Sequence, residues 1–322
     1  MMRGSAVLLV TTCAVGLAQS RWSVTEIPGM KDVTFLRIGF VDDRIGWLAD
    51  GRSRIALTLD GGHTWREVNA PSSISHFDVA GLWFADEKRG WATGDVDGHP
   101  TIWETVDGGD SWTVALSWPR VYEDSTGALL DICFVDASRG WAVGFNGFNS
   151  IVLATNDGGH HWETQYSGSE IDGQFNEVQC EDALNCWVLG PNAVMQTEDG
   201  ESWRLVYFDH STLGNLDVIS HSNVWGAAGW DHILHGTRGG VRWTEVPLKA
   251  DDFSEYVKFA DAKTGWVVLN KERIKMTRDG GKTWTREATP ALHGLTPCAM
   301  AATSTTLFVI ANPGHLLERP LH

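Results

Sequence analysis

The chain has 322 residues, of which 43% are apolar, 35 are glycine and 17 are tryptophan. This composition excludes a disordered chain, and the glycine content disfavours a helical bundle. The formal net charge of −16 disfavours a polyanionic partner, so neither a nucleic acid nor an anionic membrane surface is expected. No apolar run reaches the roughly 20 residues of a spanning helix, which excludes an integral helical membrane protein.

The N-terminus has the pattern of a secretory signal peptide. Residues 1–3 carry a positive charge, residues 5–17 are apolar or small, and Ala18 ends a stretch that matches a cleavage site. We therefore expect residues 1–18 to be removed and the mature protein to be exported, to the periplasm or outside the cell, where disulfides form. Lipidation at Cys13 is disfavoured, because the small residue that usually precedes a lipidated cysteine is missing.

One motif recurs along the chain, first as Thr-Leu-Asp-Gly-Gly-His-Thr-Trp over residues 58–65. Six copies end at tryptophans that are spaced by 47, 50, 41, 40 and 41 residues. A period of this size is typical of a propeller or a solenoid. The fifth copy has Arg238 in place of the aspartate. The other five carry Asp60, Asp107, Asp157, Asp199 and Asp279.

A second motif precedes each of these copies. It consists of a short apolar strand, a polar turn, then Gly-Trp or a variant of it, and a further apolar strand, as in residues 134–144 and 259–269. Each period therefore holds four short strands, here called A, B, C and D in chain order. Four strands per repeat without a helical period predict the blade of a β-propeller.

The two ends of the chain supply a seventh blade. Residues 305–312 align with residues 263–270 and predict strands A to C, whereas residues 21–28 resemble residues 242–247, which form a D strand. A blade built from both termini closes the ring and leaves no open edge. The prediction is an all-β, seven-bladed propeller over residues 19–322 in a single domain, closed by the N-terminal strand.

The paired Gly-Trp strands and Asp-Gly-Gly-x-Thr-Trp turns resemble the BNR or Asp-box repeat superfamily. They look most like the photosystem II stability/assembly factor family, over roughly residues 21–320. This resemblance implies a non-enzymatic scaffold that binds a protein or peptide. Because sialidases, xyloglucanases and sortilin-type receptors share the repeat, a BNR-type glycoside hydrolase or carbohydrate-binding protein is the alternative.

The enzyme signatures are mostly missing. Arg37-Ile38-Gly39 lacks the proline of the sialidase motif, and the chain has only four tyrosines from which a sialidase nucleophile could come. Xyloglucanase-like hydrolysis uses two acids across a cleft between two propellers, and this chain is long enough for one. The fragment Asp95 to His99 lacks most ligands of a calcium loop. No catalytic residue, cofactor or metal site is predicted, and hydrolysis by acid pairs in the loops stays open.

The repeated aspartates are interpreted as structural, because each carboxylate can accept hydrogen bonds from the N–H groups of its own turn. The tryptophan that follows is expected to pack against the neighbouring blade. Cys180 and Cys186 flank a turn and predict a disulfide, with two buried thiols as the alternative. Cys133 and Cys298 fall in A strands, where they are expected to be small buried residues.

In a propeller the D–A and B–C loops share one face, and the Asp turns lie on the opposite face. The longer D–A loops, between residues 69 and 297, suggest binding on the first face, here called the loop face. Its surplus of acids favours a neutral or cationic partner and departs from the basic patch associated with the assembly-factor family. We expect a monomer. The aromatic residues that could contact a peptide or sugar, or simply pack the loops, are Trp118, Tyr122, Phe148, Tyr166, Trp230 and Tyr256.

Overall fold

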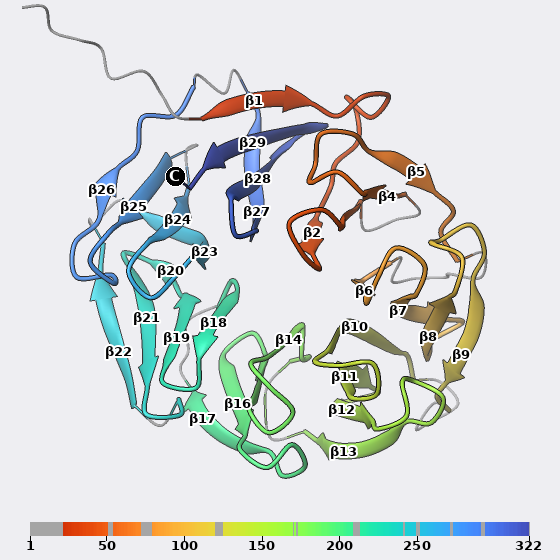
Figure 1. Ribbon diagram of the computed structural model, residues 1–322. Coiled ribbons are helices and arrows are strands. Elements are labelled where there is room, and N and C mark those ends of the chain that lie inside the picture. The colour runs from red at the N-terminus through yellow and green to blue at the C-terminus, as the bar shows by residue number, and fades with distance from the viewer. Residues whose placement is uncertain are drawn as a thin grey trace, which may run out of the picture.

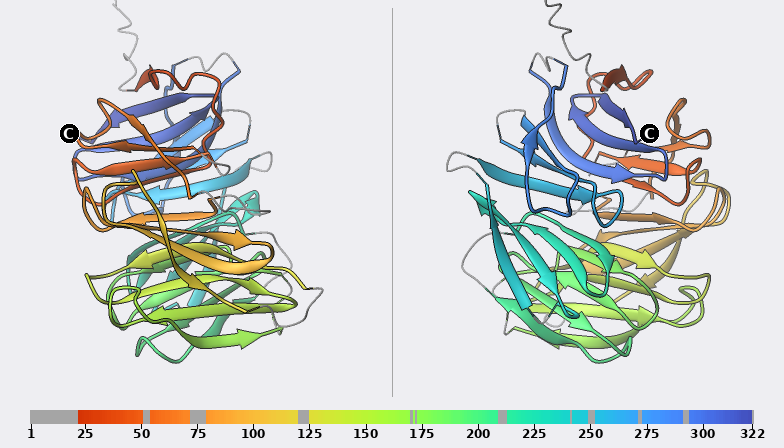
Figure 2. Two further views of the ribbon diagram at one scale, coloured as in Figure 1. Left: turned by 90° about the vertical axis from the view of Figure 1, so that its right-hand side faces the viewer. Right: turned by 60° about the vertical axis from the view of Figure 1, so that its left-hand side comes forward.

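The computed structural model describes residues 22–50, 54–71, 79–119, 125–169, 171, 173–208, 213–240, 242–248, 252–270, 273–290 and 294–321. The regular elements of these ranges are all β-strands, which form seven sheets arranged in a ring (Figure 1). Side views show the strands running between the two faces of that ring (Figure 2). The predicted seven-bladed propeller is confirmed. The signal-peptide segment lies outside the described residues.

The first three blades follow one another in chain order, each from the inner strand A to the outer strand D. Blade 1 contains β2 (Arg37–Phe40), β3 (Gly46–Ala49), β4 (Ile55–Thr58) and β5 (Arg66–Val68). Blade 2 contains β6 (Gly81–Phe84), β7 (Gly90–Val96), β8 (His99–Thr105) and β9 (Thr113–Ser117). Blade 3 contains β10 (Gly127–Phe134), β11 (Gly140–Asn146), β12 (Asn149–Thr155) and β13 (Glu163–Gly168).

The next three blades continue around the ring, and one strand crosses a seam. Blade 4 contains β14 (Glu177–Cys180), β15 (Cys186–Leu189), β16 (Ala193–Thr197) and β17 (Arg204–Phe208). Blade 5 contains β18 (Leu216–Ser220), β19 (Asn223–Ala227), β21 (His232–Thr237) and β22 (Arg242–Pro247). Blade 6 contains β23 (Phe253–Phe259), β24 (Gly265–Leu269), β25 (Arg273–Thr277) and β26 (Thr285–Arg286). The short strand β20 (Gly229–Trp230), from the B–C connection of blade 5, pairs with β23.

Blade 7 closes the ring with strands from both ends of the chain. It contains β27 (Thr296–Ala302), β28 (Thr306–Asn312) and β29 (His315–Pro320), and β1 (Ser23–Glu26) pairs with β29 as its outer strand. Val24 lies opposite Leu317 in this pairing. Trp22, just before the strand, is 5% exposed and donates its indole N–H to Glu287 of the neighbouring blade at 3.1 Å. Closure by the N-terminal strand is therefore confirmed.

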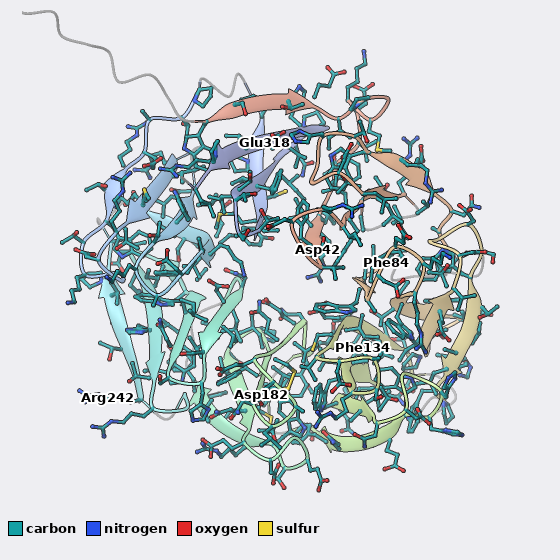
Figure 3. The ribbon with its side chains drawn as sticks, in the orientation of Figure 1. Asp42, Phe84, Phe134, Asp182, Arg242 and Glu318 are labelled. Atoms are coloured by element: carbon teal, nitrogen blue, oxygen red, sulfur yellow. A yellow bond between two sulfur atoms is a disulfide. The ribbon has the colours of Figure 1, made fainter. Side chains whose placement is uncertain are left out.

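The core lies in the seams between blades and is built from repeated aromatic residues. Trp91 of blade 2 stacks on Phe134 of blade 3 with 4.0 Å between ring centroids, and the Asp-turn Trp162 meets Phe134 edge-on. Phe84 and Phe134 both lie toward the inner part of their blades (Figure 3). The glycine before the B-strand tryptophan leaves room for this ring, because a Cβ at Gly140 would lie 2.6 Å from Phe134. The repeat thus encodes the seam.

Candidate binding site

The Asp-turn carboxylates satisfy donors in their own hairpins. Asp107 Oδ1 accepts the Ser111 N–H and the Thr105 hydroxyl, both at 2.8 Å, and Oδ2 accepts the Ser111 hydroxyl at 2.6 Å. The Ser111 hydroxyl, followed by the Ser111 N–H and the Thr105 hydroxyl, lowers the pKa of Asp107 to about 2. An exposed carboxylate with so low a pKa is a permanent acceptor and is unsuited to proton transfer.

The same arrangement recurs in the other copies. Hydrogen bonds from the turn lower the pKa of the carboxyls of Asp60, Asp157, Asp199 and Asp279. A second repeated aspartate lies in the A–B turns, where the sequence predicted only polar residues. Its Oδ1 accepts two N–H groups two and three residues later, at Asp42, Asp86, Asp136, Asp182 and Asp261. Both sets lie on the face opposite the loop face.

The structure separates the six predicted contact residues by exposure. Phe148 is 86% exposed at the tip of the β11–β12 turn. In this two-residue turn Gly147 adopts the positive φ, of 65°, so the second position can hold a residue with a large side chain. Trp118 and Tyr166 are half-buried and pack against seam clusters. Tyr256 is also half-buried and lines the central cavity. Tyr166 lies on β13 and Tyr256 on β23, so the expectation that these two residues belong to loops is wrong, and only Trp118 follows the end of its strand.

Two of the six cannot be placed as side chains. The backbone of Trp230 pairs with Phe253 of blade 6, so this residue belongs to the β20–β23 pair and not to a free loop. Tyr122 lies outside the described residues. The described aromatic residue with the largest exposed surface on the loop face is therefore Phe148.

The acids of the loop face do not all contribute free charge. Asp252 is 1% exposed, and its carboxylate forms ion pairs with Arg273, at 2.6 Å, and with Lys275. Asp95 is fully buried and accepts the Gly98 N–H of its own turn at 2.8 Å. These two carboxylates therefore do not add free negative charge to the loop face. No group of three metal-ligating side chains occurs among the residues that the structure describes.

A central cavity of about 590 Å³ runs along the inner strands of all seven blades. Its polar lining residues form hydrogen bonds between neighbouring blades. Asp131 of blade 3 accepts the Val178 N–H of blade 4 at 2.9 Å, and Glu177 of blade 4 accepts the Leu216 N–H of blade 5 at 2.9 Å. Arg37 of blade 1 donates to the main-chain oxygen of Ala80 in the next blade at 3.0 Å.

Asp217, a buried residue of blade 5, forms further hydrogen bonds of this kind between blades. Its carboxylate accepts the Phe259 N–H and the Lys258 ammonium of blade 6, both at 2.6 Å. The sequence showed polar residues in these A strands but gave no prediction for them. Their role depends on contact between blades, which a repeat motif does not reveal.

Burial shifts the acidity of the cavity carboxyls in the direction opposite to the Asp turns. Burial raises the pKa of Glu177 to about 7, against the hydrogen bonds from Leu216 and Gln179 that favour its ionised form. The pKa of Asp131 is raised by the same cause, with Arg37 opposing it. Two carboxyl groups that influence each other thus face one cavity.

A second hollow, of about 770 Å³, opens beside the connection between β1 and β2. It is lined by residues 29–34 together with Glu26, Asp50 and Arg54, and it shares Leu36 with the central cavity. Leu36 is 49% exposed. Leu36 therefore lies between a hollow at blades 7 and 1 and the central cavity, and the surface formed by these two hollows and Leu36 is here called the Leu36 groove.

The Leu36 groove was not predicted from the sequence, because the predicted binding loops began at residue 69. The signal was present: residues 27–36 separate a D strand from an A strand and are therefore a D–A connection like the others. Leu36 directly precedes the cavity residue Arg37. Because side chains alternate along a strand, Leu36 is expected at the rim of the cavity and not inside it.

Cys180 and Cys186 form a disulfide across β14 and β15, with their Cα atoms 4.0 Å apart. The bond lies close to Asp182 and is drawn in yellow in Figure 3. Of the other two described cysteines, Cys133 is buried as expected, whereas Cys298 is only half-buried. The Cys298 thiol donates to the Phe35 main-chain oxygen at 3.3 Å, at the seam between blades 7 and 1.

Comparison with known families supports the resemblance read from the repeats. The family profile described as photosynthesis system II assembly factor YCF48 matches residues 113–227. The resemblance is confirmed. The profile covers blades 3 and 4 completely, together with the last strand of blade 2 and the first two strands of blade 5. No curated protein sequence matches the chain. Within the described residues, no helix is long and apolar enough to cross a membrane.

Solved structures of YCF48 share the fold. "YCF48 bound to D1 peptide" superposes with a TM-score of 0.75 at 17% identity and covers 95% of this chain and 99% of that chain. YCF48 from Cyanidioschyzon merolae gives 0.69 at 17%, with 92% and 98% covered. The GH74 enzyme of Niastella koreensis gives 0.62 at 13%, covering 86% of this chain but only 50% of that one. At these identities the likeness establishes the propeller fold.

Proposed function

We propose that this protein is an exported, non-enzymatic propeller that binds an extended segment of another protein in the Leu36 groove. The observation that carries the proposal is the half-exposed Leu36 side chain at the junction of two hollows on the loop face. An apolar side chain between two hollows suits an extended chain that reaches from one hollow to the other, because buried apolar anchors supply most of the energy of such interfaces.

Three further observations support this reading. Residues 113–227 match the YCF48 profile, and a YCF48 of the same fold was solved with a D1 peptide. The residues before the ring have the pattern of a signal peptide, which supports export. The net charge of −16 favours a segment that is neutral or cationic.

The test uses a phage-displayed library of short peptides selected on the wild-type protein, followed by anisotropy titration of an enriched peptide. Leu36→Ala is expected to weaken binding about tenfold, which corresponds to about 1.4 kcal/mol. Leu59→Ala is the matched control, because Leu59 is 44% exposed on the Asp-turn face. Equal affinities for the two variants would contradict the groove. A loss confined to Phe148→Ala would move the site to blade 3.

The glycoside hydrolase is the second candidate, and one observation favours it. A glycosidase needs a pair of carboxyl groups, one protonated and one ionised. Glu177, with a pKa of about 7, shares the central cavity with a second carboxyl group, that of Asp131. Against this, both carboxylates accept main-chain N–H groups from the next blade. Release of reducing sugar from a β-glucan, lost in Glu177→Gln but kept in Leu36→Ala, would favour the hydrolase over the scaffold.

A further inference from the structure

Three of the five cysteines gather at the seam between blades 3 and 4. Cys180, at the end of β14, is bonded to Cys186 on β15. Cys133, on the inner strand β10 of blade 3, places its Sγ 3.4 Å from the Cys180 Sγ. Cys133 and Cys180 both line the central cavity. A free thiol is therefore in contact with one sulfur of a disulfide from the neighbouring blade.

We propose that this cluster is a thiol–disulfide exchange site, in which Cys133 displaces Cys186 from its bond to Cys180. The Cys133 thiolate attacks the Cys180 Sγ, the Cys180–Cys186 bond breaks, and Cys186 leaves as a thiolate that takes up the proton given up by Cys133. One disulfide and one thiol are present before and after the step. The rearrangement therefore needs no oxidant or reductant.

The exchange changes what the disulfide holds together. The Cys180–Cys186 bond spans six residues and stays inside one hairpin. A Cys133–Cys180 bond would span 47 residues and join the inner strands of blades 3 and 4. Because a longer closed loop removes more conformational entropy from the unfolded chain, the second linkage is expected to stabilise the ring more than the first.

The surroundings of the three sulfurs suit both states. Cys186 is fully buried in the seam cluster, where a neutral thiol packs as a small apolar group. Burial, reinforced by the charge of Asp131 on the same strand, raises the pKa of the Cys133 thiol well above its usual range. Since the thiolate is the nucleophile, the direct exchange is expected to be slow at neutral pH and to become faster as the pH rises.

The first experiment asks whether Cys133 and Cys180 can bond. Folded Cys186→Ala, treated with oxidised glutathione, is expected to form a Cys133–Cys180 linkage in mass spectra of unreduced peptides, and to melt at a higher temperature than its reduced form. Cys133→Ala is the matched control and should keep the Cys180–Cys186 linkage. Cys298 is an internal control that should remain available to alkylation throughout, because it lies at another seam.

The second experiment uses the wild-type protein in a buffer of reduced and oxidised glutathione, quenched with acid and alkylated after denaturation. The proposal expects two isomers, with alkylated Cys186 appearing at the expense of alkylated Cys133. Two results overturn it: Cys133 and Cys180 both alkylated in oxidised, folded Cys186→Ala, or wild-type protein in which Cys186 never becomes alkylated. If Cys186→Ala fails to fold, the wild-type measurement alone decides.

Discussion

The protein uses carboxylates at its Asp turns and in its central cavity for the same task, the binding of main-chain N–H groups, with opposite effects on acidity. Asp107 is exposed, bonds within its own hairpin, and has a pKa lowered to about 2, chiefly by the Ser111 hydroxyl. Glu177 faces the cavity, reaches a strand of the next blade, and has a pKa raised to about 7 by burial.

This difference teaches which carboxylates hold the ring together. A turn carboxylate organises one hairpin, and water can replace it when it is removed. A cavity carboxylate joins two blades where water is scarce, so its removal leaves buried donors without an acceptor. Stability is therefore expected to depend more on the buried carboxylates that join blades, although the Asp turns are the more conspicuous feature of the sequence.

The largest effect is expected for Asp217→Ala. This change removes the acceptor of the Lys258 ammonium and the Phe259 N–H and leaves a partly buried cation without its counter-charge. Breaking a buried ion pair costs about 3–5 kcal/mol of stability. We expect a loss at the lower end of this range, because the Lys258 side chain is 27% exposed to solvent. Urea unfolding measures the loss. Adding Lys258→Met should restore part of it, and no restoration would contradict the pairing argument.

A smaller and pH-dependent effect is expected for Glu177→Gln. Folding raises the pKa of Glu177 from 4.5 to about 7. Protonated Glu177 therefore contributes fully to the stability of the folded protein below pH 4.5, and this contribution is lost as the pH rises through 7. The loss is on the order of 1–3 kcal/mol, reduced by water in the cavity. Melting temperatures between pH 4 and 8 should fall less for Glu177→Gln than for wild type. Glu163→Gln, on an exposed strand, should follow the wild type.

The smallest effect is expected for Asp107→Ala, which removes acceptors from one exposed turn. Since folding lowers the pKa of Asp107 from 3.8 to about 2, its stabilisation is present above pH 3.8 and disappears as the pH falls through 2. Thermal melts should show a modest loss at neutral pH and peptide binding should be unchanged. A loss of stability larger than that of Asp217→Ala would contradict the conclusion that the buried carboxylates between blades matter more than the turn carboxylates. Val106→Ala is the control, because Val106 lies in the same turn and is 68% exposed.

The sequence by itself determined the features that are encoded within one repeat. The period of tryptophans, the four strands of a blade, the turn aspartates and the pairing of Cys180 with Cys186 all depend on residues close together in the chain. Ring closure followed as well, because a D strand at one end and strands A to C at the other are incomplete alone. Local patterning is sufficient for such features, since turns and hairpins form from neighbouring residues.

Tertiary structure alone decided what happens where different blades meet. It placed Cys133 against Cys180, placed Leu36 between two hollows, and packed Trp118 and Tyr166 into seams. None of these contacts has a fixed spacing in the chain, because each depends on which strands the ring brings side by side. The repeat specifies the ring through local pairing, whereas the chemistry of its cavity comes from residues that differ between blades, and a repeat pattern carries no information about them.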